Sequence, residues 1–295
     1  MYAIRTEKAS GDCCGGGGSL YEMEQEVTAF LDLMESKQLI SKLEHRDISR
    51  VEQDHVKRDL VALYYYLNER KAKELELTVP CALHARMMDV VLRLPYILEV
   101  FVEFSIKIAG DKKYDATTIV TALRLFPALA QGSLTTDAGA IAAQRHRLTT
   151  NGKVPAIKLS DLELRVDDET SIYPKDWVTL HLTLTREHVS DAKSIAPLAG
   201  TLYDKKSKSF IYRKDHLWVV VQDSVTHHLM GAWKVDDTSG QVTDALGFWA
   251  PPMIGDVNLE VRVLSTVYLD TEAHEVLKMK VVSPTAVIEE IIDDE

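Results

Sequence analysis

The sequence has little cysteine, with three residues in a chain of 295. Cys13, Cys14 and Cys81 cannot build a disulfide framework, and none has a C-x-x-C or Cys/His companion at metal-ligand spacing. This excludes a small secreted scaffold held together by disulfides and favours a reducing compartment.

Long hydrophobic runs are also missing. The longest apolar stretches, such as residues 100–108, are interrupted by charges and fall well short of the roughly 20 residues that a membrane span requires. The first residues carry Arg5, Glu7 and Lys8 but no hydrophobic segment of a signal peptide. We therefore expect a soluble chain that crosses no bilayer by itself and lies on the cytosolic side.

Positive charge is in deficit. Lys plus Arg total 34 against 45 Asp plus Glu, which gives a formal net charge of -11 and disfavours broad binding to nucleic acid. One basic cluster with interleaved aromatic residues could contact an anionic surface, although a solvated hairpin is the simpler interpretation. Its basic members are Lys205, Lys206, Lys208, Arg213 and Lys214.

What is present fits an ordinary globular protein of two domains. Hydrophobic residues make up 46% and charged residues 27%, and the chain is longer than most single cores. The periodicity of apolar positions predicts an α+β protein in which a helical bundle precedes an all-β, immunoglobulin-like sandwich. The predicted parts are a flexible segment (1–18), the bundle (19–150), the sandwich (151–284) and an acidic tail (285–295).

The bundle is predicted from apolar positions at intervals of three and four. Ser19 and Glu22 have the spacing of a capping box, and Asp47 can cap a second, longer helix that runs to residue 67. Pro80 suits the first turn of a third helix, which is predicted to run to residue 94.

Two further helices complete the predicted bundle. Pro95 interrupts the hydrogen-bond ladder, so residues 96–109 are predicted as a separate or kinked helix. Thr117 or Thr118 can start the last helix, which Pro127 bends before it ends at Gly132.

After residue 152 the apolar period changes to two, which is typical of strands. Residues 177–184 alternate strictly, residues 217–221 form a nearly continuous apolar run, and residues 257–263 and 276–282 alternate again. Turn signals separate these segments, as a sandwich of about seven short strands requires. Because all four tryptophans fall in this half, we expect them to supply core area, although one or two could anchor a partner.

No catalytic constellation is found, so the chain is expected to be no enzyme and to hold neither cofactor nor metal. His227 and His228 are adjacent on an expected strand, so their side chains point to opposite faces and cannot share an ion. The acidic residues 167–169 suit a charged turn at least as well as a Mg²⁺ site, because no phosphate loop accompanies them. No G-x-S-x-G elbow is present.

Several local strings are distinctive: LPYILE (94–99), LAQG (129–132), VPAI (154–157), DDE (167–169), VTLHLTLTR (178–186), LWVVVQD (217–223), FWAPP (248–252) with Gly255, and STVYLD (265–270). Together they resemble the Sec sixty-three family, whose cytosolic module is also found in spliceosomal unwinding helicases. The resemblance runs from about residue 80 to residue 283.

The sequence also departs from that family. Thr266 and Val267 replace the polar pair of the usual Ser-Asp-Ser-Tyr motif, and residues 133–153 are short for the family's inserted helix-loop-helix. Because neither a J domain nor a membrane span is present, coupling to a lumenal chaperone would need a partner, such as a J-domain membrane protein.

The resemblance implies a non-catalytic subunit or fragment of the protein-translocation machinery at the cytoplasmic face of the endoplasmic reticulum. Its partners would be Sec channel subunits and other translocon subunits, and it would dock on the channel for post-translational import. Two alternatives stay open, an accessory module of an RNA helicase or spliceosomal complex and an unrelated β-sandwich adaptor. The expected partner-binding residues are the basic cluster named above together with Pro251, Pro252, Glu289, Glu290, Asp293 and Asp294.

Overall fold

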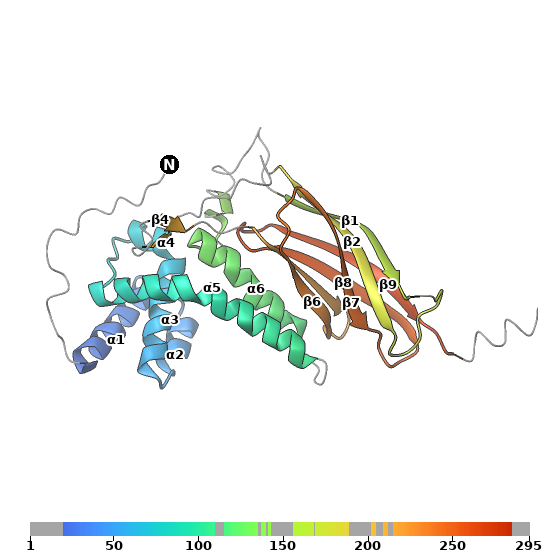
Figure 1. The fold of residues 1–295 in the computed structure, drawn as a ribbon. Coiled ribbons are helices and arrows are strands. Elements are labelled where there is room, and N and C mark those ends of the chain that lie inside the picture. Colours follow the sequence, from blue (N-terminus) through green and yellow to red (C-terminus); the bar gives the residue numbers. More distant parts are fainter. Residues whose placement is uncertain are drawn as a thin grey trace, which may run out of the picture.

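The structure, a computed structural model, describes residues 20–109, 115–134, 137–139, 141–142, 156–167, 169–188, 202–204, 209–211 and 215–284. Helices occupy the N-terminal part and strands the C-terminal part, which confirms the α+β class (Figure 1). The helices are α1 (Leu20–Ser36), α2 (Lys42–Ser49), α3 (Asp54–Leu67), α4 (Glu69–Glu74), α5 (Cys81–Ala109) and α6 (Ala116–Gln131). Within the described ranges, no helix combines the length and apolar character that crossing a membrane requires.

Helix starts differ from the prediction where a nearby side chain makes a better cap. The second helix, predicted from Asp47 to residue 67, is divided in two: Asp47 lies inside α2, which the capping box of Ser41 and Glu44 starts six residues before it, and α3 begins at Asp54. The helix at α6 begins after Asp115, whose carboxylate accepts a hydrogen bond from the Thr117 amide at 2.8 Å. Gly132 ends α6 as predicted, with a left-handed φ of 64°. Ser19 lies outside the described residues.

Pro95 does not divide the third helix. Residues 81–109 form the single helix α5, so of the two predicted outcomes, a separate helix or a kinked one, the separate helix is ruled out. Proline removes one hydrogen bond from the ladder, and here the packing of Val91, Leu98 and Val102 on the buried face keeps the segment helical.

The strands form two larger sheets and a small ribbon, β3 with β4. One sheet has the order β1-β2-β7 and the other β6-β5-β8-β9, and every pairing within them is antiparallel. The strands are β1 (Ala156–Arg165), β2 (Trp177–Glu187), β3 (Leu202–Asp204), β4 (Ser209–Ile211), β5 (Leu217–Asp223), β6 (Leu229–Val235), β7 (Gln241–Trp249), β8 (Gly255–Ser265) and β9 (Glu272–Val281).

Strand β5 is buried on both faces, which explains its continuous apolar sequence. Leu217, Val219 and Val221 point into a core shared with the β1-β2-β7 sheet. Trp218 and Val220 point the other way and join the core of the helices. The four-stranded sheet therefore lies between two hydrophobic cores.

The helices pack against this second face of the sheet. Helices α5 and α6 run side by side next to the strands, and α6 contacts both β5 and β8 (Figure 1). Polar contacts frame the junction: Arg124 binds Glu272 at 2.8 and 2.9 Å, and Lys234 binds Glu99 at 2.5 Å. The helical part and the sheets are thus joined by a continuous core with ion pairs near its edges.

Candidate functional site

The most exposed aromatic feature of the sheets is a pair of tryptophans. Trp177 at the start of β2 and Trp249 at the end of β7 are partners in the sheet register, with ring centroids 4.9 Å apart and planes at 72°. They are 48% and 63% exposed, whereas the neighbouring Val178 and Phe248 are buried. Because side chains alternate across a strand, both indoles lie on the face opposite the core.

Gly247 makes room for this pair. A Cβ atom at Gly247 would lie only 2.3 Å from the Trp177 ring, so the indole rests directly against the glycine backbone. Glycine inside a strand often marks such a close approach. Because residue 247 has no side chain, the Trp177 ring can occupy this space.

The loop after β7 extends the exposed apolar surface. Pro251 is half-buried and Pro252 exposed, while Met253 and Ile254 are 75% and 61% exposed. The start of this loop is fixed, since the Ala250 amide donates to the Asp176 carbonyl at 2.8 Å. We call the set Trp177, Trp249, Pro251, Pro252, Met253 and Ile254 the apolar tip. Such a surface suits contact with another protein better than chemistry.

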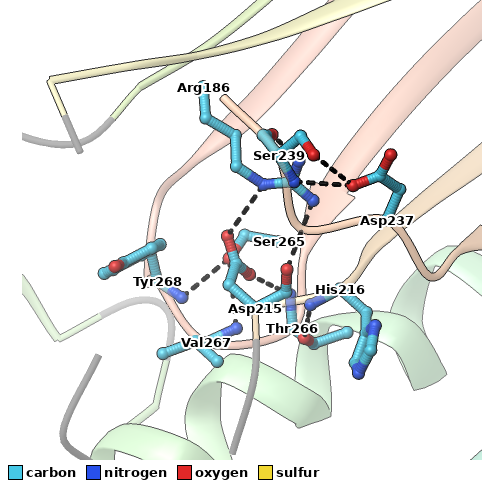
Figure 2. A network of polar contacts seen from close by, with 9 residues as sticks. All are labelled: Arg186, Asp215, His216, Asp237, Ser239, Ser265, Thr266, Val267 and Tyr268. Atoms are coloured by element: carbon cyan, nitrogen blue, oxygen red, sulfur yellow. Dashed lines mark hydrogen bonds and ion pairs between the residues drawn. The ribbon is translucent and has the colours of Figure 1, made fainter. Parts of the chain in front are cut away.

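A second feature is a buried polar network around Asp215, which lies just before β5 (Figure 2). Ser265 Oγ donates to the Asp215 carboxylate at 2.6 Å and accepts from the amides of Val267 and Tyr268 at 3.1 and 2.9 Å. The Arg186 guanidinium lies 3.9 Å from the same carboxylate and donates to the Ser239 carbonyl at 2.7 Å. The network therefore fastens the turn after β8 to the starts and ends of three other strands.

Burial dominates the electrostatics of this network. It raises the pKa of Asp215 from 3.8 to about 6, against the lowering effects of the Ser265 hydrogen bond and the Arg186 charge. Burial also lowers the pKa of Arg186 and raises that of Tyr268 to about 12. Since the Arg186 side chain is buried and that of Asp215 is only 13% exposed, we assign the network to positioning the turn and not to contact with a ligand.

Thr266 joins the turn after β8 to the segment before β5. Its hydroxyl accepts a hydrogen bond from the His216 amide at 2.9 Å, and its amide donates to the His216 carbonyl at 3.0 Å. The next residue, Val267, is buried and packs in the helical core. Polar contacts of one residue and apolar packing of the next thus hold this turn in place.

The structure places only part of the predicted contact set. Pro251 and Pro252 belong to the apolar tip. The described residues do not include the basic members of the cluster, Lys205, Lys206, Lys208, Arg213 and Lys214, or the acidic Glu289, Glu290, Asp293 and Asp294. Trp218 supplies core area as predicted, but Trp177 and Trp249 do not. The alternation of residues 177–184 already indicated that Trp177 lies outside the core. Trp177 points to the opposite face of the strand from Val178 and from the buried residues that alternate after it.

The two adjacent histidines were expected on a strand and lie instead in the connection between β5 and β6. His227 has a left-handed φ of 55°, which ends the regular alternation there. Its carbonyl accepts from the Ala116 amide at 2.9 Å, so this turn contacts the start of α6. Asp167 lies in a turn as expected, and Asp168 is outside the described residues. In the part of the chain that the structure describes, no group of acidic, histidine or cysteine residues could hold a metal ion.

A scan against protein-family models finds no match, and a search of curated proteins finds no significant similarity. Function is therefore inferred from the residues and their geometry.

Proposed function

We propose that the chain is a non-catalytic docking module of the Sec sixty-three type, which binds the Sec channel on the cytosolic face of the endoplasmic reticulum. It would act in post-translational import through its binding surfaces. The proposal also includes a finer description of the fold, an immunoglobulin-like sandwich of the fibronectin type III kind. Its partners would be the channel subunits, with any J domain supplied by another membrane protein.

One observation carries the proposal: the strings that resemble the family meet at the junction between helices and sheet. Gln131 of the LAQG string donates to the Val267 carbonyl of the STVYLD string at 2.8 Å. Glu99 of the LPYILE string binds Lys234, next to the LWVVVQD strand in the register. Segments that are far apart in the chain thus contact each other at one interface. This is expected of sequence motifs that maintain the arrangement of helices and sheet.

The strand order supports the sandwich. A three-stranded β1-β2-β7 sheet and a four-stranded β6-β5-β8-β9 sheet contribute to a single core, which includes Leu180, Leu182, Val219 and Val261. Antiparallel sheets of three and four strands with crossing connections between them are typical of this class. A rigid body of this kind presents loops and strand ends to partners without any catalytic group.

The apolar tip is the docking surface that we propose for the channel. Tryptophan and methionine are enriched in the cores of protein interfaces, and tryptophan is among the residues that most often anchor them. The tip also stands on a fixed base, because the Trp177 ring is seated on Gly247 and the loop is bonded to Asp176. A preorganised surface loses less conformational entropy when it binds.

The test is affinity purification of the tagged chain from gently solubilised membranes, followed by identification of the proteins that co-elute. We expect channel subunits with the unmodified chain and at least a tenfold loss, about 1.4 kcal/mol, when Trp249 and Ile254 are both changed to Ser. Val276→Ser is the matched control, because Val276 is equally apolar and 52% exposed but lies on β9. Recovery of RNA-protein components without channel subunits would contradict the proposal and favour the helicase-module alternative.

A further inference from the structure

Helix α5 carries a second exposed apolar surface, independent of the apolar tip. Its members follow the three-and-four spacing of one helix face, which predicts contact with another helix. Among the described residues the face is bare to solvent: Phe104 is 60% exposed and Tyr96 is 72% exposed. The full set, the α5 face, is Tyr96, Ile97, Val100, Phe101 and Phe104.

The size of the α5 face matches half of a protein interface. From the exposed fractions, its side chains present roughly 500 Å² of accessible surface, near the upper end of what monomers leave uncovered. A standard interface buries about 800 Å² on each partner, of which somewhat more than half is apolar. One such interface would therefore cover the whole face.

Charges on the same side of the helix are arranged symmetrically. Leu98 lies midway between Arg93 and Glu103, and also midway between Asp89 and Lys107, and all four of these charged residues are exposed. If a second α5 ran antiparallel across the first, centred on this position, each Arg93 would face a Glu103 and each Asp89 a Lys107. The pattern is thus complementary to itself.

We propose that the α5 face binds the same face of a second copy of this chain, forming a two-fold symmetric dimer with antiparallel α5 helices. An isologous contact requires a self-complementary patch, which the apolar stripe with its flanking charges provides. In this arrangement Phe104 of one copy lies opposite Leu92 of the other. This inference does not depend on the proposed function.

A groove between α3 and α5 gives the facing aromatic ring a place to bind. It measures about 210 Å³ and is lined by apolar residues of both helices, with four charged residues, Asp59, Arg86, Asp89 and Arg93, at its sides. Asp59 and Arg86 are joined by hydrogen bonds of 2.5 and 2.6 Å, so this wall is fixed. A space of about 150 Å³ accommodates a benzene ring, so the groove has room for Phe104 of a second copy. Its apolar lining includes Leu60, Leu63, Val90, Leu94 and Ile97.

The test is the mass of the whole chain in solution, measured by sedimentation and light scattering over about 1 to 100 µM. We expect the mass to rise from 33.1 kDa to twice that value. A symmetric dimer contains the Arg93–Glu103 pair twice, so reversing either charge creates two repulsive pairs. Arg93→Glu and Glu103→Arg should therefore each raise the dissociation constant about five- to tenfold. The double variant restores complementarity and should return to the unmodified value. Phe104→Ser should weaken the dimer by about thirtyfold or more.

Controls separate this result from misfolding and from docking. All three positions are exposed, so the variants should keep the circular dichroism of the unmodified chain and nearly its melting temperature, because the Arg93–Asp89 ion pair that one of them removes is itself exposed. Trp249→Ser, in the apolar tip, should leave the dimer unchanged. A chain that stays monomeric throughout overturns the proposal, and so does a double charge variant as weak as the single ones. Loss of channel subunits instead of the dimer would assign the α5 face to a different partner.

Discussion

Gln131 at the end of α6 donates a hydrogen bond to the main-chain carbonyl of Val267, 2.8 Å away and 136 residues later in the chain. Both residues are buried, so water is excluded from the contact. A buried carbonyl without its donor costs about 1 to 3 kcal/mol. This one side chain therefore contributes to holding the helices against the sheets.

We predict that Gln131→Leu lowers the free energy of unfolding by about 1 to 3 kcal/mol. Urea denaturation, followed by both circular dichroism and tryptophan fluorescence, measures it. Arg124→Ala is the matched control at the same junction, since its ion pair with Glu272 is exposed and should contribute less than about 1 kcal/mol. An equal loss in both variants would contradict the role given to Gln131.

The network of Figure 2 predicts an unusual pH dependence. The pKa of Asp215 is raised to about 6 in the folded chain, so between its unfolded pKa of 3.8 and pH 6 the folded state binds more protons. Stability must then fall as pH rises through this window, by on the order of 3 kcal/mol for a group so deeply buried. Asp215→Asn should remove this decline.

The measurement is the unfolding free energy of both proteins at about pH 4, 5, 6 and 7. The difference between the two curves cancels the titration of other groups, so the variant should gain relative to the unmodified chain as pH rises. Two parallel curves would show that the pKa of Asp215 is unchanged by folding.

Gly247→Ala should disrupt the tryptophan pair. The new methyl group would lie 2.3 Å from the Trp177 ring, which must swing into solvent and leave Trp249. We expect the near-ultraviolet circular dichroism of the pair to weaken and its fluorescence to shift toward longer wavelength. Gly240→Ala is the control, because no atom lies within 4 Å of an added Cβ there.

Two tryptophans should differ sharply in their effect on stability. Trp218 is 2% exposed and lies between β5 and the helices, so Trp218→Ala should cost about 3 to 5 kcal/mol. Trp249→Ala removes a ring that is mostly in water and should change stability by less than about 1 kcal/mol. Thermal unfolding of both variants checks this, and comparable losses would contradict the assignment of Trp249 to an outer surface.

Much of the fold could be predicted because the apolar period changes once. Intervals of three and four indicated helices before residue 132, and alternation indicated strands after residue 156. Boundaries were less predictable where two caps competed, as with Asp47 and Ser41, since the choice depends on which hydrogen bonds close. The sequence left open whether Pro95 separates two helices or only kinks one, because tertiary packing decides whether the local cost of proline breaks the helix.

The candidate surfaces were harder to predict than the elements. Pro251 and Pro252 were expected at a contact, and the sequence allowed one or two of the four tryptophans to lie outside the core, but it did not tell which, because composition does not distinguish the two faces of a strand. The Asp215 network brings together the ends of four strands. Local sequence patterns do not predict contacts between residues so far apart in the chain. Only the folded topology places Arg186 beside Asp215.

The core that joins helices and sheet also sets an order of events during synthesis. Helix α6 leaves the ribosome first, and the turn that covers its end, with Val267, follows 136 residues later. At roughly 5 to 20 residues per second, this face waits about 7 to 27 seconds for its partner. Until β8 and this turn emerge, Leu123, Phe126 and Leu129 lack part of the sheet that packs beside α6, so a nascent-chain chaperone can bind this helix during the interval.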